Sequence, residues 1–148
     1  MLVLRNILVP TDFSETSDKA LDFAIELAQK FEAQVTVMHA YEIPVVGFPD
    51  GALIATAEVA GRIADASRAA LDRTVETHRG RGVPLDALLR EGVAWEEIDS
   101  VADELDADMI VIGTHGRRGL ARALLGSVAE NVVRTAHRPV LTIHGPHP

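Results

Sequence analysis

The stretch DMIVIGTHGRRGLARALLGSVAEN, residues 108–131, decides the fold class of this chain. It begins with an apolar run that is typical of a buried strand. It then passes through four glycines and three arginines and ends in a pattern that is typical of a helix start. In open α/β sheets, ligands bind beyond the carboxyl ends of strands. The stretch therefore predicts a strand–loop–helix unit with a ligand site at its loop.

Strand-like and helix-like segments alternate on either side of this stretch. Short apolar runs predict strands at residues 3–9, 34–40, 85–90, 108–113 and 139–144. This order favours a parallel sheet that helices cover on both faces. The 148 residues are enough for one domain with its own core, which the few aromatic residues (4%) predict to be aliphatic. We therefore predict a single doubly wound α/β domain.

Apolar residues at spacings of three and four predict the helices between the strands. In residues 17–31 and 94–106, these positions hold Ala20, Phe23, Ala24, Leu27, Phe31, Ile98, Val101, Ala102 and Leu105. Residues 49–80 are expected to form one long helix whose apolar side holds Leu53, Ala57, Ala64, Leu71 and Val75. The glycines at positions 80 and 82 are expected to end that helix.

Composition and charge exclude several function classes. The formal net charge is −8, which argues against a sequence-independent grip on nucleic acid and against binding to anionic membranes. The absence of cysteine excludes disulfides, thiolate chemistry and cysteine-ligated zinc. The first ten residues are too short and too interrupted for a signal peptide or a spanning helix. We therefore expect a cytoplasmic protein without membrane insertion.

The end of the first strand carries Pro10, Thr11 and Asp12. Asp12 and Glu15 have the spacing of a capping box for the helix that follows. Ser14 competes for the same cap, which would leave Asp12 in the loop as an acceptor for a ribose or a base N–H. A metal ligand is a further alternative for Asp12. The residues alone leave these readings open.

The glycine-rich stretch carries a second candidate site. Gly113 and Gly116 stand where positive φ or a close backbone approach suits glycine. Ser127 and Glu130 have the spacing of another capping box, and helix N-termini bind phosphate through their free N–H groups. The loop arginines that could neutralise a phosphate are Arg117, Arg118 and Arg122. The alternative is a solvated basic loop. Walker, dinucleotide and hydrolase motifs are absent.

The spacing Gly113-x2-Gly116-x9-Gly126-Ser127, together with the earlier Pro-Thr-Asp, resembles the signature of the ATP-binding branch of the universal stress protein family. Residues 7–42 and 107–144 resemble the opening and the ending of that family, so the resemblance covers nearly the whole chain. It implies one nucleotide-binding domain over residues 1–148. It also implies a Rossmann-like sheet of strand order 3-2-1-4-5.

The resemblance implies ATP as the ligand, with Mg²⁺ arriving on the nucleotide rather than held by a protein cage. Adenine and ribose would contact Pro10, Thr11 and Asp12, and the backbone of Ala40 would bind the base. The residues implied around the ribose and phosphates are Gly113, Thr114, His115, Gly116, Gly126, Ser127 and Val128. The loop arginine Arg117 is added to this expected site because its charge could neutralise a phosphate. The family often has a hydroxyl residue after that valine, where this chain has Ala129.

The histidines predict neither catalysis nor a metal site. His115 could donate to a phosphate or order the loop, but no base–nucleophile pair accompanies it, so we assign no catalytic residue. The spacing of the other histidines does not match a zinc site; these are His39, His78, His137, His144 and His147.

The last predicted strand is apolar and should lie at a sheet edge, where it needs cover. The family implies a homodimer through this strand, residues 139–144, with Val140, Leu141, Thr142 and Ile143 at the centre. Protection of the edge by Pro139 and the proline-rich tail is the alternative. We expect a cytoplasmic stress-response protein whose bound ATP regulates an unknown protein partner. A slow ATP or adenylate hydrolase and a nucleotide-independent interaction protein are the alternative functions.

Overall fold

The computed structural model describes residues 1–44, 47, 49, 57–115 and 125–145. Five parallel strands form one sheet in the order β3-β2-β1-β4-β5. The strands are β1 (Asn6–Pro10), β2 (Gln34–Tyr41), β3 (Leu85–Glu91), β4 (Met109–Gly113) and β5 (Val140–Ile143). The helices are α1 (Glu15–Phe31), α2 (Ala57–His78), α3 (Ala94–Glu104) and α4 (Ser127–Thr135). The predicted fold class and strand order are confirmed.

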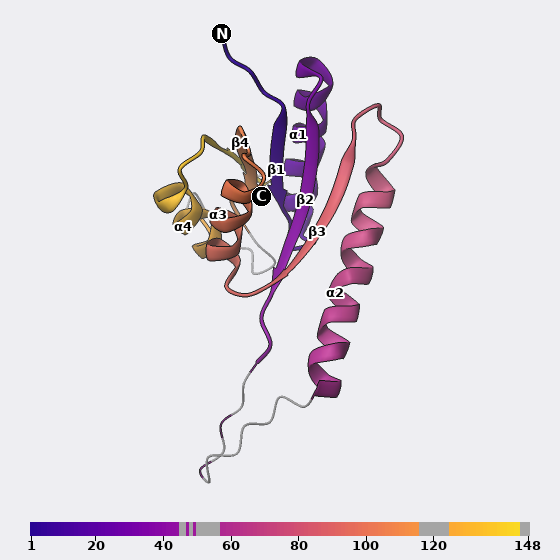
Figure 1. Ribbon diagram of the computed structural model, residues 1–148, viewed down its shortest axis with the longest axis vertical. Coiled ribbons are helices and arrows are strands. Elements are labelled where there is room, and N and C mark those ends of the chain that lie inside the picture. The colour runs from indigo at the N-terminus through magenta and orange to yellow at the C-terminus, as the bar shows by residue number, and fades with distance from the viewer. Residues whose placement is uncertain (45–46, 48, 50–56, 116–124, 146–148) are drawn as a thin grey trace.

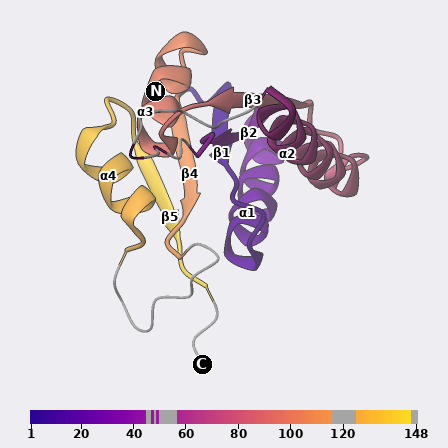
Figure 2. The ribbon, with the colours of Figure 1, turned by 90° about the horizontal axis from the view of Figure 1, so that it is seen from below.

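Helices cover both faces of the sheet. α1 and α2 lie on one face, and α3 and α4 lie on the other (Figures 1 and 2). The chain winds from β1 outward through β2 to β3, and then returns to the other side of β1 with β4 and β5. This reversal leaves a crevice beyond the carboxyl ends of β1 and β4, where open α/β sheets bind ligands.

Each face of the sheet buries an aliphatic core. On the α1/α2 face, the fully buried side chains include Leu21, Ile25, Val37 and Leu71. On the α3/α4 face they include Met38, Ile110, Val101 and Val132. Residues alternate between these cores along each strand because successive side chains of a strand point to opposite faces. The sheet is therefore buried on both sides, as its apolar strands predict.

The predicted apolar side of α1 is wrong at its two aromatic positions. Phe23 is 43% exposed and Phe31 is 42% exposed. The buried residues of this helix are Thr16, Ser17, Ala20, Leu21, Ala24, Ile25 and Ala28. The helix presents mostly small residues to the sheet, which allows its backbone to approach closely. The prediction gave weight to the bulky phenylalanines, although the neighbouring spacing through Leu21, Ile25 and Ala28 fits the helical period equally well.

Several predicted boundaries also change. β1 begins at Asn6 rather than at residue 3, because the N–H groups of Arg5 and Asn6 donate to the side chain of Asp108. β4 begins after that same Asp108. β2 and β3 each extend one residue beyond the prediction, and β5 is shorter by one residue at each end. These shifts are of the size expected at the ends of elements.

The long helix expected at residues 49–80 is described from Ala57 to His78. Pro49 lies in a turn, and residues 50–56, with Leu53 among them, lie outside the described part of the chain. Leu71 and Val75 are buried as predicted, whereas Ala57 is exposed. After the helix, Gly80 and Gly82 have φ of +83° and +77°, which glycine adopts readily.

In α3, the predicted core residue Leu105 stands at the C-cap and is 37% exposed. Within the described residues, none of the helices combines the length and apolarity needed to cross a bilayer.

Candidate functional site

A cavity of about 380 Å³ lies at the carboxyl ends of β1, β2 and β4. This volume is within the range of pockets that hold small molecules and cofactors. Its lining comprises Pro10, Thr11, Asp12, Ser17, Met38, His39, Ala40, Ala94, Ile98, Ile112, Gly113, Thr114, His115, Gly126, Ser127, Val128 and Ala129. The amino-terminal turns of α1, α3 and α4 therefore all contribute to it.

The lining differs in chemistry from one side to the other. The carboxyl end of β2 and the start of α3 contribute the apolar residues Met38, Ala40, Ala94 and Ile98, beside the imidazole of His39. The turn after β1 and the start of α4 contribute polar side chains, among them Asp12 and Ser127. A molecule with a flat, weakly polar part and an anionic part would match this division, because each part would meet groups of its own kind.

The turn between β1 and α1 holds Asp12 at the cavity. The Asp12 Oδ1 atom accepts a hydrogen bond from the Ser14 N–H at 3.0 Å. Ser14 is the N-cap of α1, and its Oγ accepts from the Ser17 N–H at 3.2 Å. The predicted capping box of Asp12 with Glu15 is therefore wrong, because Ser14 has the extended backbone that an N-cap needs. Asp12 is left to line the cavity.

Phe13 stands in this turn with a strained backbone. Its φ is +66°, in the left-handed region that a bulky side chain rarely adopts. Such a conformation costs about 1–3 kcal/mol and is found mainly where surrounding contacts enforce it. The Phe13 ring lies against the His39 ring with centroids 4.4 Å apart, and the Phe13 N–H donates to the Thr11 Oγ1 at 3.0 Å. The strain is thus located beside the cavity.

Gly113, the first glycine of the signature, is required by a close approach. A Cβ added here would lie 2.9 Å from the Thr16 Cγ2 and 3.1 Å from the Thr16 carbonyl carbon and oxygen. Real Cβ atoms essentially never come as close as the first of these distances. The sequence allows two reasons for a glycine at this position, a positive φ or a close backbone approach. The structure supports the close approach. α1 can lie against the end of β4 only because Gly113 has no side chain.

α4 begins at the cavity with its backbone N–H groups unpaired within the helix. Its N-cap is Gly126, and its first backbone bond runs from the Glu130 N–H to the Gly126 carbonyl at 2.9 Å. The predicted capping box is wrong, because Ser127 is the first residue inside the helix rather than its N-cap. The first turn of a helix cannot pair its own N–H groups, and these groups attract anions. Three such residues, Ser127, Val128 and Ala129, line the cavity.

Thr114 and His115 connect the cavity to the edge of the sheet. The Thr114 N–H donates to the Ile143 carbonyl of β5 at 2.9 Å, and the Gly126 N–H donates to the Thr114 carbonyl at 2.6 Å. The Thr114 Oγ1 lies 3.0 Å from the His115 Nδ1. Among the described residues, the buried Nε2 of His115 has no hydrogen-bond partner. A buried polar atom without a partner costs free energy, so a ligand atom here would be stabilised.

The structure brings the predicted site residues together wherever it describes them. Pro10, Thr11, Asp12, Ala40, Gly113, Thr114, His115, Gly126, Ser127 and Val128 all line the one cavity. Gly116 and Arg117, together with Arg118 and Arg122, lie outside the described residues. The lining residues absent from the prediction are Ser17, Met38, His39, Ala94, Ile98, Ile112 and Ala129. Most of these are apolar, and Ile98 had been assigned only to the core. A sequence offers little signal to distinguish a cavity wall from a core.

Comparison with known proteins points to one family. The model of the universal stress protein family matches residues 4–144. The universal stress protein MJ0531 of Methanocaldococcus jannaschii is 37% identical over 144 residues, covering 96% of this chain and 83% of that protein. A solved universal stress protein in complex with cAMP is 27% identical, with a TM-score of 0.70 over 97% of this chain and 98% of that one. A universal stress protein of Archaeoglobus fulgidus in complex with dAMP is 25% identical, with a TM-score of 0.65 over 97% of this chain and 99% of that one.

Proposed function

The chain belongs to the universal stress protein family, and we propose that it binds an adenine nucleotide in the cavity beyond β1, β2 and β4. The observation that carries the proposal is the division of this cavity. Mostly apolar residues of β2 and α3 form one side, and N–H groups of α4 that have no partner within the helix form the other. Adenine suits the first side, and phosphate suits the second. The two related structures with cAMP and dAMP support this assignment because both ligands join adenine to phosphate.

The end of β2 supplies a backbone contact for the base in this proposal. The Thr11 N–H donates to the Met38 carbonyl at 2.8 Å, so the backbone groups of Met38 face β1. Because these groups alternate along a strand, those of Ala40 point to the same side, where β1 has ended. Ala40 lines the cavity there. We assign its backbone to the adenine edge and Asp12 to the ribose.

ATP is the nucleotide that we propose, with Mg²⁺ arriving on its phosphates. Ser127, Val128 and His115 would contact the phosphates, and the proposal retains Gly116 and Arg117 as further contacts. The glycine–serine signature of the family's ATP-binding branch, Gly113, Gly116, Gly126 and Ser127, supports this choice. The protein would act in the cytoplasm as a stress-response regulator whose bound nucleotide controls its interaction with a protein partner.

The proposal includes a homodimer through β5. This strand is at the edge of the sheet, and all four of its residues are half-buried. The carbonyl of Pro139 accepts from Ile110 of β4, and the carbonyl of Ile143 accepts from Thr114 just after β4, at 2.9 Å each. The N–H and C=O of Thr142 therefore point away from β4. Such outward groups pair readily with another strand. Thr142→Pro removes the outward donor while sparing the bonds to β4, and it should convert the dimer to a monomer in light scattering. A monomeric wild-type protein would contradict the dimer.

Thermal unfolding of nucleotide-stripped protein tests the proposed function. We expect ATP, ADP and AMP to raise the midpoint and GTP to leave it unchanged. At a ligand concentration 100-fold above Kd, the stabilisation is about 2.7 kcal/mol. Unchanged midpoints with all adenine nucleotides would overturn the proposal and favour a nucleotide-independent interaction protein. Release of phosphate in the same samples would instead favour the slow hydrolase.

A further inference from the structure

His39 lies at the cavity and contacts both sides of the Asp12 turn. Its Nδ1 donates to the Thr11 carbonyl at 2.7 Å, just before Asp12. Its ring packs on Phe13, just after Asp12, with centroids 4.4 Å apart. Because a carbonyl only accepts, the Nδ1 of His39 carries a proton. One side chain of β2 therefore holds the residues that flank Asp12.

The bond from His39 has a consequence for the backbone of its neighbour. The Thr11 N–H forms the last bond of the β1–β2 ladder, to the Met38 carbonyl at 2.8 Å. In a parallel ladder, the next bond would run from the Ala40 N–H to the Thr11 carbonyl. The Thr11 carbonyl accepts from the imidazole of His39, and among the described residues no backbone bond joins this carbonyl to the Ala40 N–H. Ala40 meanwhile lines the cavity.

Phe13 explains why the turn departs from the ladder at this point. With φ of +66°, Phe13 turns the chain sharply away from β2 and into α1. The Thr11 Oγ1 accepts from the Phe13 N–H at 3.0 Å and lies 3.0 Å from the Ser17 Oγ. These bonds support the strained residue from the α1 side, and the His39 ring supports it from the sheet side. The conformation is thus held by contacts on both sides.

We propose that His39 is a positioning residue of the adenine nucleotide site. Its Nδ1–H bonds the Thr11 carbonyl and holds it toward the imidazole, so that the Ala40 N–H serves the base of the ligand instead of extending the ladder. Its stacking on Phe13 fixes the turn that presents Asp12. This inference rests on the proposed function and deepens it, because it names the side chain that prepares the base and ribose contacts.

A matched pair of variants tests this role. His39→Asn keeps an N–H donor at the same number of bonds from the backbone, whereas His39→Leu removes it. We expect His39→Leu to bind adenosine, AMP and ATP about tenfold more weakly, by the same factor for each, because the contact prepared is to the nucleoside. His39→Asn should restore part of the affinity, because it returns the donor to the Thr11 carbonyl but not the ring that packs on Phe13. Calorimetric titration of nucleotide-stripped proteins gives these values.

The rate of hydrogen exchange at the Ala40 N–H distinguishes the proposed role of His39 from a purely structural one. A purely structural role would leave this rate unchanged in the ligand-free variant. In the wild-type protein, adenosine should slow this exchange at least tenfold. In ligand-free His39→Leu, the exchange should already be slow, because the Ala40 N–H then joins the Thr11 carbonyl. Exchange at Ala40 that is equal in ligand-free wild type and His39→Leu would overturn the role given to the imidazole.

Failure of this inference is distinguishable from failure of the proposed function. Wild-type protein that binds none of the adenine compounds overturns both. Wild type and His39→Leu that bind adenosine equally overturn the inference alone. If His39→Leu does not fold, Phe13→Gly decides, because glycine adopts a φ of +66° freely and only the ring is lost. Weaker adenosine binding by Phe13→Gly supports the inference, and equal binding by Phe13→Gly contradicts it.

Discussion

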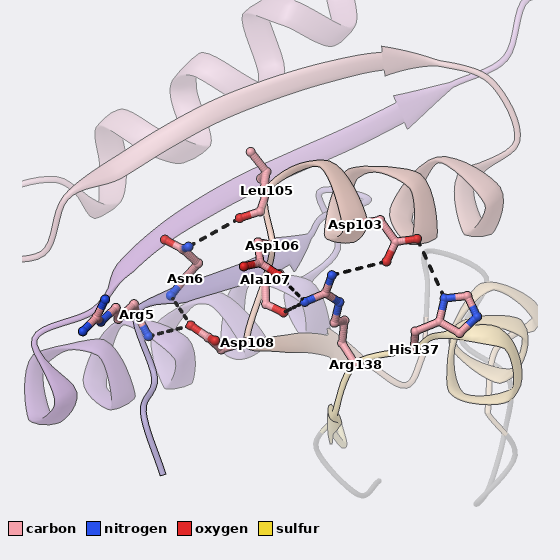
Figure 3. A network of polar contacts seen from close by, with 9 residues as sticks. All are labelled: Arg5, Asn6, Asp103, Leu105, Asp106, Ala107, Asp108, His137 and Arg138. Carbon is pink, nitrogen blue, oxygen red and sulfur yellow. Dashed lines mark hydrogen bonds and ion pairs between the residues drawn. The ribbon is translucent and has the colours of Figure 1, made fainter. Parts of the chain in front are cut away.

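The two ends of the sheet carry polar residues in different arrangements. At the amino ends of β1 and β4, the Asp108 Oδ2 accepts from the N–H groups of Arg5 and Asn6 at 2.8 and 2.9 Å (Figure 3). Arg138 reaches the Asp106 carboxylate at 2.8 Å and the Ala107 carbonyl at 3.0 Å. At this amino end of the sheet, the carboxylates of Asp106 and Asp108 and the guanidinium of Arg138 are paired with one another or with the backbone.

At the carboxyl end of the sheet, polar groups surround a cavity instead. The first turn of α4 has N–H groups there that the helix itself does not pair, and the His115 Nε2 lacks a partner among the described residues. A sheet gains stability when buried polar groups are satisfied, so an end that leaves them unsatisfied must have another use. The difference fits the proposal that the amino end of the sheet serves the fold and that the carboxyl end binds a ligand.

The largest expected effect comes from Gly113, which belongs to the carboxyl end of the sheet but also holds the fold. Gly113→Ala places a Cβ 2.9 Å from the Thr16 Cγ2, so it should lower the free energy of unfolding by about 1–3 kcal/mol. Denaturant unfolding measures this loss. In a Thr16→Ser background, which lacks the Cγ2, Gly113→Ala should cost less. An unchanged free energy of unfolding in Gly113→Ala would show that the two elements do not pack this tightly.

Two serines that start helices should separate stability from binding. Ser14 caps α1, so Ser14→Ala should lower the free energy of unfolding by about 1 kcal/mol. Ser127 is not an N-cap, so Ser127→Ala should change it by less than about 0.5 kcal/mol. Ser127→Ala should instead weaken ATP binding by about tenfold and leave adenosine binding unchanged. A large loss of stability in Ser127→Ala would mean that the hydroxyl serves the helix and not the phosphate.

For Asp108, at the amino end of the sheet, we expect a loss of stability without a loss of ATP binding. Asp108→Asn replaces the carboxylate that accepts from two backbone N–H groups with an uncharged amide, which is a weaker acceptor. It should therefore lower the free energy of unfolding by about 1 kcal/mol. Its affinity for ATP should match that of the wild-type protein, which calorimetric titration can check. Weaker ATP binding in a folded Asp108→Asn variant would contradict the separation between the two ends.

The smallest effect is the pH dependence of stability. The N–H groups of Arg5 and Asn6 hold the pKa of Asp108 below its ordinary value of 3.8. The folded protein therefore binds this proton more weakly than the unfolded chain does. The stabilisation is present above about pH 4 and is lost as the pH falls through the folded pKa, and Asp108→Asn should reduce this slope. Denaturant unfolding between pH 3 and pH 7 measures it.

Asp18 provides a control with the opposite sign. Burial raises the pKa of this α1 carboxyl above its ordinary value of 3.8, so the folded protein binds its proton more tightly. Asp18→Asn should therefore be more stable than the wild type at pH 7, and this difference should shrink as the pH falls. If the free energy of unfolding of Asp108→Asn depended on pH as strongly as that of the wild type, the role given to the Asp108 carboxylate at the amino end would be contradicted.

Much of this organisation can be predicted from the sequence because strands and helices carry different apolar periods. The runs at Val35–Val37 and Ile110–Ile112 stand between helical patterns, and this alternation predicts the parallel sheet. The strand order came from a family resemblance, since periodicity does not tell which strands are neighbours. The chain reversal then predicts where the cavity lies.

The errors arose where local sequence gives equal support to two arrangements. Phe23 and Leu21 both fit the helical period of α1, and only packing against the sheet selects the smaller face. Asp12 and Ser14 can both cap α1, and the extended backbone of Ser14 decides between them. His39 gave no signal, because its role depends on Thr11 and Phe13, which the fold brings to it.

The amide spectrum of nucleotide-stripped protein titrated with Mg-ATP tests the central claim most directly, because it reports both ends of the sheet at once. We predict shifts at the carboxyl end, in Thr11, Asp12, Ala40, Thr114, Ser127 and Val128. The amides at the amino end should stay unchanged, in Asn6, Asp106, Asp108 and Arg138. Shifts confined to the amino end, or no shifts at saturating Mg-ATP, would contradict the assignment of the carboxyl end to an adenine nucleotide.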